Sequence, residues 1–182
     1  MNKQTKSRLQ MVALLVLFAL PLGIALLLSN NGWQPQRTRS SGILVNPPRN
    51  LDLIPVTLSD GKPLQWQGKD VPWTLLALPG EQCAVACLDR LEEILRMRIT
   101  LGHETDRLRV VYLGPALPSG FVASHKQLLV GLDVTNAFAS ERAQAGDPLA
   151  LALVDPQGLM MMRYTDDYAA TGVRSDIKKI IY

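Results

Sequence analysis

The chain has 182 residues, a formal net charge of +3 and a pI near 9.0. Three of its 19 basic residues, Lys3, Lys6 and Arg8, precede a long apolar run, and the remainder carries 16 basic residues against 16 acidic ones. A neutral remainder without a dense basic patch excludes nucleic acid as an expected partner.

Residues 11–28, MVALLVLFALPLGIALLL, form an uncharged run of 18 residues. As a helix this run spans about 27 Å, close to the thickness of a hydrocarbon core. No suitable small-residue cleavage site follows it, so an uncleaved transmembrane anchor is predicted, with cleavage as the alternative. The positive-inside rule then places residues 1–10 in the cytoplasm and the C-terminal domain in the periplasm, tethered to the inner membrane.

Residues 29–50 are rich in Ser, Asn, Pro and Arg, which is typical of an extended linker. The folded domain is therefore expected over residues 51–182. Its first element is a hairpin over residues 53–66, because two short apolar runs flank the turn signal Asp60-Gly61.

A buried strand is predicted over residues 73–79, followed by an amphipathic helix over 84–100 and a second buried strand over 107–114. Between 115 and 145 only one helix is expected, near 136–144. Two apolar runs within 148–165 flank the turn at 155–158, and apolar spacing predicts a last helix over 173–181. This order predicts an α/β domain with a mixed central sheet flanked by helices, which resembles the thioredoxin arrangement.

The two cysteines of the chain, Cys83 and Cys87, lie at the predicted junction of strand and helix. Helical spacing places their Cα atoms about 6 Å apart, which suits a disulfide or a shared soft metal ion. A helix N-terminus also favours the thiolate form. Disulfides persist outside the cytoplasm, but so short a loop adds little stability, so a chemical role is favoured over a structural one.

The anchor, the thioredoxin-like order of elements and C-x-x-x-C after the first central strand together resemble the Sco/SenC proteins. The segments GILVNPPRNL and WTLLAL before the cysteines also look like a divergent Sco-like group. The resemblance covers residues 51–182. It implies a copper-binding assembly factor for cytochrome c oxidase, with Cys83 and Cys87 as ligands of Cu(I).

The chain departs from the Sco pattern at two places. CAVACL lacks the two prolines of the family's cysteine motif, and Asp147-Pro148 stands where the family has Asp-His, so the histidine ligand is missing. His103 and His125 are interpreted as loop histidines. Three consecutive methionines, Met160 to Met162, cannot converge from one strand and are interpreted as packing residues.

Pro148 has a second interpretation. Redox proteins of the thioredoxin type place a cis-proline before this strand, facing the cysteines, and Pro148 is a candidate for that position. The alternative is an ordinary proline at the start of a strand. A cis-proline here favours thiol–disulfide exchange over a copper site.

Three hypotheses for function follow. The preferred one is a membrane-anchored, Sco-like accessory protein for cytochrome c oxidase biogenesis, whose thiol pair binds Cu(I) or performs redox chemistry. Its expected partners are the membrane and oxidase subunits or other assembly factors, and turnover as an enzyme is not expected. The alternatives are a membrane-tethered thiol–disulfide oxidoreductase and a non-catalytic thioredoxin-fold module with a structural disulfide.

Overall fold

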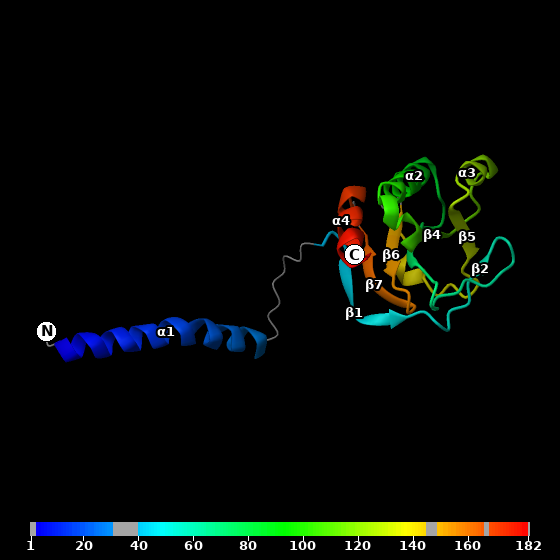
Figure 1. Ribbon diagram of the computed structural model, residues 1–182. Helices are drawn as coiled ribbons and strands as arrows, with labels where there is room; N and C mark the ends of the chain where they lie inside the picture. Colours follow the sequence, from blue (N-terminus) through cyan, green and yellow to red (C-terminus); the bar gives the residue numbers. More distant parts are fainter. Residues whose placement is uncertain (1–2, 31–39, 145–148, 166–167, 182) are drawn as a thin grey trace. The chain divides into compact units, whose positions relative to one another are not determined.

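The computed structural model describes residues 3–30, 40–144, 149–165 and 168–181. The chain divides into two compact units, residues 1–39 and residues 40–182. In the first unit, α1 (Lys3–Asn30) is one helix that contains Pro21 and begins eight residues before the apolar run (Figure 1). Apolar side chains such as Leu14, Leu17 and Phe18 are each more than 60% exposed.

Among the described residues, no helix is both long and apolar enough to meet the requirement for crossing a membrane. The transmembrane anchor at residues 11–28 therefore stays a prediction.

The second unit is built on a seven-stranded sheet with the order β1-β7-β6-β3-β4-β5-β2 (Figure 1). Three neighbouring strands, β3, β4 and β5, are parallel, and the remaining pairs are antiparallel. The strands are β1 (Ile43–Asn50), β2 (Thr57–Leu58), β3 (Trp73–Leu78), β4 (Leu108–Leu113), β5 (Leu128–Leu132), β6 (Ala150–Val154) and β7 (Leu159–Tyr164).

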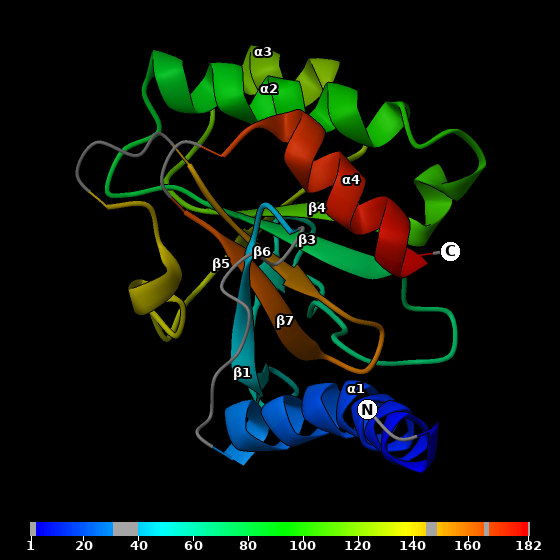
Figure 2. The same cartoon turned by 90° about the vertical axis from the view of Figure 1, so that its left-hand side faces the viewer.

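Two apolar clusters cover the two faces of the sheet. The first packs α2 (Val85–Ile99) and α4 (Ala170–Ile181) against the strands, and Cys87 belongs to it. Figure 2 shows α2, α3 (Ser119–Ser124) and α4 together on this side of the sheet. The second cluster holds loop residues such as Leu51, Trp66 and Phe138, and none of its residues comes from these helices.

Most of the predicted elements are confirmed. The strands over 73–79 and 107–114, the helix over 84–100, the hairpin within 148–165 and the last helix appear with bounds that differ by at most three residues. The turn at Asp60-Gly61 is also present: Leu58 N donates to Lys62 O over 2.8 Å, and Gly61 has φ 83°. Its first arm, β2, pairs with β5.

The predicted helix near 136–144 is wrong. This segment holds only a 3-10 turn, η2 (Ala139–Glu141). The carboxylate of Asp133 accepts hydrogen bonds from Ala137 N and Phe138 N, which fixes the preceding residues as a loop. The sequence interpretation also missed α3, β5 and the 3-10 helix η1 (Gly102–Arg107).

The predicted start of the domain at Leu51 is corrected to Ser40. Residues 43–50, assigned to the linker from sequence, form β1 at the edge of the sheet, antiparallel to β7. The strand is hard to recognise from the sequence because it contains Pro47 and Pro48. The register of β1 shifts between Leu44 and Arg49, across these prolines. Prolines are accepted at an edge because no second neighbour needs their missing N–H.

Candidate thiol–disulfide site

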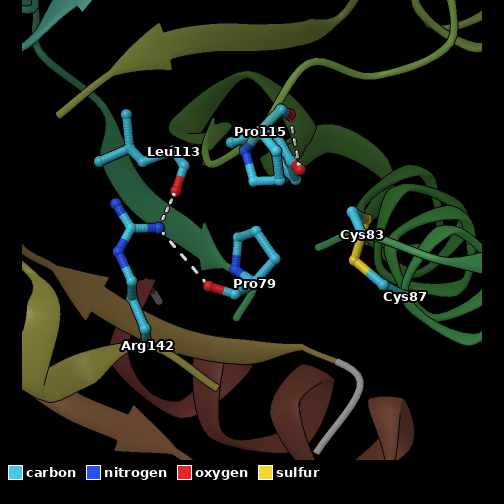
Figure 3. The surroundings of a disulfide bond; sticks show 7 residues. Pro79, Cys83, Cys87, Leu113, Pro115 and Arg142 are labelled. Carbon is cyan, nitrogen blue, oxygen red and sulfur yellow. Dashed lines mark hydrogen bonds between the residues drawn. A yellow bond between two sulfur atoms is a disulfide. The ribbon is translucent and has the colours of Figure 1, made fainter. Parts of the chain in front are cut away.

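Cys83 and Cys87 form a disulfide with their Cα atoms 5.1 Å apart (Figure 3). The predicted proximity of the two cysteines is confirmed. Their environments differ: Cys83 is half-buried, whereas Cys87 is only 2% exposed and packs in the core beneath α2. Cys83 is therefore partly exposed to solvent, and Cys87 is shielded from it.

Local sequence explains this placement. β3 ends at Leu78 because Pro79 has no N–H with which to continue the ladder. α2 starts at Val85 with the extended residue Ala84 as its N-cap, which makes no side-chain capping bond. Cys87 lies in the first turn of α2 on the same face as Leu91, so it points into the core. Cys83 precedes the helix and stays at its open end.

Arg142 joins the ends of the parallel strands beside the disulfide. Its Nη1 donates to the carbonyl oxygen of Leu113 over 2.7 Å and to that of Pro79 over 3.5 Å (Figure 3). Its Nη2 contacts the carboxylate of Asp133, just after β5, at 3.3 Å. The guanidinium group thus connects the carboxyl ends of β3, β4 and β5, and it holds the loop that leads to Cys83.

Close packing at Gly114 supports the same loop. A Cβ at Gly114 would collide with the Pro79 ring, so only glycine lets β4 end against Pro79. Below them, the hydroxyl of Tyr112 donates to Pro115 O over 3.0 Å. Burial raises the pKa of Tyr112 to about 12, which keeps this phenol protonated, and Arg142 opposes the shift only in part.

A pocket of about 540 Å³ opens beside these strand ends. It lies at the carboxyl edge of the parallel strands, where open α/β sheets commonly bind ligands. Along the chain, its wall comes within two residues of Cys83, at Glu81. The lining residues are Gly80, Glu81, Gly114, Pro115, Leu132, Asp133, Asn136, Ala139, Arg142 and Ala143.

Among the described residues, neither cysteine and neither histidine is part of the pocket lining. Pro148, the candidate cis-proline, and Asp147 lie outside the described residues. His103 is exposed in η1, and His125 stacks on Phe121 with its Nδ1 2.9 Å from Phe121 O. His125, the C-cap of α3, is a loop residue as predicted, whereas His103 lies in a 3-10 helix rather than in a loop.

The methionines are packing residues, as predicted. Met160 is fully buried in one apolar cluster and Met162 is 2% exposed in the other, because the pairing of β7 with β6 shifts register between them. Within the described part of the chain, no group of three or more His, Cys, Asp or Glu residues is placed to hold a metal ion.

Sequence reasoning missed Arg142, Asp133 and Gly114. One signal was available: Gly114 and Asp133 directly follow strands, and polar or small residues at the carboxyl ends of parallel strands commonly build sites. For Arg142 no local signal exists, because its partners Leu113 and Pro79 are 29 and 63 residues away in sequence.

Residues 73–181 match a protein family described as "transmembrane-like, thioredoxin-like, C-terminal domain". The chain belongs to this family. The matched region of the transmembrane-like, thioredoxin-like family starts at β3 and includes the disulfide, the pocket and α4. No curated protein matches the sequence.

Solved structures support the fold assignment of this family member. Yeast Sco1 with copper bound aligns with a TM-score of 0.57 at 16% identity, over 80% of this chain and 94% of that one. Apo Sco1 of Thermus thermophilus gives 0.55 at 14% identity, over 81% and 99%. Copper-bound ScoI of Arabidopsis thaliana gives 0.53 at 16% identity, over 70% and 95%. The chain therefore has a thioredoxin-like fold similar to that of Sco proteins, with a C-x-x-x-C pair.

Proposed function

We propose that this protein is a membrane-anchored, Sco-like accessory factor of cytochrome c oxidase biogenesis that exchanges its Cys83–Cys87 disulfide with thiols of a partner protein. The observation that carries the proposal is the asymmetry of the disulfide. Cys83 is half-buried at the open end of α2, whereas Cys87 is 2% exposed.

This asymmetry assigns the order of the chemical steps. A partner thiolate attacks Sγ of Cys83, the bond between Cys83 and Cys87 breaks, and Cys87 leaves as a thiolate that takes up a proton. A second thiol of the partner then attacks the mixed disulfide and releases Cys83. Two electrons pass from the partner's thiols to the pair, and the partner gains a disulfide. The reverse sequence reduces a partner disulfide.

The backbone of α2 assists the first step. Cys87 lies in the first turn of this 15-residue helix, where free N–H groups favour a negative charge. The side chain is otherwise surrounded by apolar residues of the core, which disfavour a lasting thiolate. Cys87 is thus suited to leave and then re-form the disulfide rather than to attack external substrates.

Support for the oxidase context comes from likeness of fold. A structure titled as a disulfide switch in BsSco, a member of the Sco family of cytochrome c oxidase assembly proteins, aligns over 74% of this chain with a TM-score of 0.50 at 14% identity. The anchor is supported by the uncharged run at 11–28 and by the exposed apolar side chains of α1. The positive-inside rule places the thiol domain in the periplasm, where disulfides persist.

Copper binding by the reduced pair is a second candidate function, favoured by the spacing of the two sulfur atoms. The donor set fits Cu(I), for which two thiolates suffice, with copper as cargo rather than as a resident cofactor. It does not fit Cu(II), which prefers additional nitrogen or oxygen donors, because the described residues supply no third ligand.

A trapping experiment in cells tests the exchange reaction. In Cys87→Ser, the Cys83 thiolate attacks a partner disulfide as in the reverse sequence, and the mixed disulfide accumulates because Cys87 is no longer there to resolve it, so it can be isolated under non-reducing conditions. The matched control is Cys83→Ser, in which the remaining thiol is buried. The proposal expects an adduct with an oxidase subunit or another assembly factor in Cys87→Ser only. Equal amounts of adduct, or none, in the two variants would contradict the proposal.

A further inference from the structure

The pocket at the strand ends contains one charge that the protein itself leaves uncompensated. Arg142 donates to Leu113 O and Pro79 O and contacts Asp133. Asp133, whose side chain is fully buried, also accepts bonds from two backbone N–H groups. The guanidinium and this carboxylate neutralise each other, so neither is free to attract a ligand of either sign.

Glu81 is different. It is exposed at the pocket wall, and in the described part of the structure its carboxylate accepts no hydrogen bond and forms no ion pair. The net charge of the lining residues is therefore −1, and this charge resides on Glu81. Glu81 precedes Cys83 by two residues, so a group paired with it lies close along the chain to the cysteine that is open to attack, although neither cysteine lines the pocket itself.

The pocket wall is also apolar in part. Leu132, at the end of β5, is 60% exposed and lines the pocket with Pro115 and Ala139. Aliphatic stems of lysine and arginine pack on such surfaces while their charged ends reach a carboxylate. A volume of about 540 Å³ is within the range of pockets that hold ligands, so it accommodates a long side chain.

We infer that this pocket is a specificity subsite that takes a lysine or arginine side chain next to the exchanging cysteine of the partner segment. The inference rests on the proposed thiol–disulfide exchange. It adds a preference for the charge of the partner, which exchange chemistry alone does not require.

The test measures how fast peptide dithiols reduce the Cys83–Cys87 disulfide of the full chain in detergent at low ionic strength. Three peptides differ only in the residue beside the first cysteine, which is Lys, Gln or Glu. Rates come from acid quenching and mass spectrometry, and each is divided by the rate for uncharged dithiothreitol with the same variant. The rate for the Lys peptide divided by the rate for the Glu peptide should be at least threefold lower in Glu81→Gln than in the wild-type protein. Comparing this ratio between the two proteins also cancels the intrinsic reactivity of the peptides.

Two further variants separate docking from general charge effects. Asp70→Asn removes an exposed carboxylate in the loop before β3, and it should leave the ratio unchanged. Ala139→Phe fills the pocket without a change of charge, and it should slow the Lys peptide selectively. An equal ratio in wild type and Glu81→Gln, or full Lys preference in Ala139→Phe, would overturn the subsite. A disulfide that resists dithiothreitol and every peptide would instead contradict the proposed function.

Discussion

Arg142 donates a hydrogen bond of 2.7 Å to the carbonyl oxygen of Leu113, the last residue of β4. The same guanidinium group reaches Pro79 after β3 and Asp133 after β5. One side chain thus connects three parallel strands at the edge where the thiol pair is located. The architecture of the site depends on Arg142, although Arg142 is neither a metal ligand nor a nucleophile.

Replacing Arg142 should destabilise the domain. Arg142→Met removes the bond to Leu113 O and leaves the fully buried carboxylate of Asp133 without its cation. Losing one partner of a buried pair costs about 2–4 kcal/mol of the free energy of unfolding. Urea denaturation of the full chain in detergent measures this loss.

The matched control for this loss is Arg107→Met. Arg107 pairs with Glu104 at 2.7 Å, but its own side chain is 56% exposed. Removing such a surface pair should cost less than about 1 kcal/mol. Equal losses in the two variants would show that Arg142 does not connect the strands as described.

The two cysteines should differ in reactivity when separated. In Cys87→Ser the free thiol of Cys83 is half-buried, whereas in Cys83→Ser the thiol of Cys87 is 2% exposed. Reaction with an aromatic disulfide reagent, followed by absorbance, should be at least about tenfold faster for Cys83, because access limits the buried thiol. A faster reaction at Cys87 would reverse the proposed order of attack.

Stability at high pH should depend on Tyr112, whose pKa is raised to about 12 by burial. Since the unfolded chain releases this proton near pH 10, stability is unaffected below pH 10 and falls as the pH rises from 10 towards 12. In Tyr112→Phe the free energy of unfolding should fall less steeply with pH, because unfolding releases up to one proton fewer. Denaturant melts between pH 8 and about 11.5 measure the slope. The dependence of stability on pH that remains in Tyr112→Phe is assigned to Tyr164, whose pKa is also raised by burial.

The reduced protein should bind Cu(I) but not Cu(II) tightly. Two thiolates satisfy Cu(I), whereas the described residues offer no third donor for Cu(II). Paired anaerobic titrations, with absorption of the thiolate-to-Cu(II) band as the readout, test this expectation. The control is the Cys83→Ser, Cys87→Ser double variant. An intense Cu(II) band in the wild-type protein would reveal another ligand, with His125 as the first residue to replace.

The N-terminal segment should hold the protein in a membrane. Extraction with alkaline carbonate should leave the full chain in the membrane fraction, and a periplasm-dependent reporter fused to the C-terminus should be active. Replacing Leu17 with Lys puts a charge in the middle of the run, which costs about 3 kcal/mol of insertion and should release part of the protein. Activity of a cytoplasm-only reporter at the C-terminus would refute this orientation.

Sequence alone was sufficient where the determining contacts are local. A window of a few residues is enough to predict β3 from its continuous apolar run, α2 from its helical spacing and the last hairpin from the turn at 155–158. The closeness of the thiol pair was likewise predictable, because the two cysteines are only four residues apart at a strand-to-helix junction, although Cys83 lies before the helix and not in it. These features required no knowledge of the neighbouring elements.

Tertiary structure decided the rest. The sequence of β1 is typical of a linker, and only its pairing with β7 makes it a strand. The sequence at 136–144 is typical of a helix, but hydrogen bonds to Asp133 hold this segment in a loop. The bonds of Arg142 to Leu113 and Pro79 join residues far apart in sequence, so no window of sequence contains both partners. The pocket at the carboxyl ends of β3, β4 and β5 exists only because these three strands end together, and that arrangement is a property of the folded sheet.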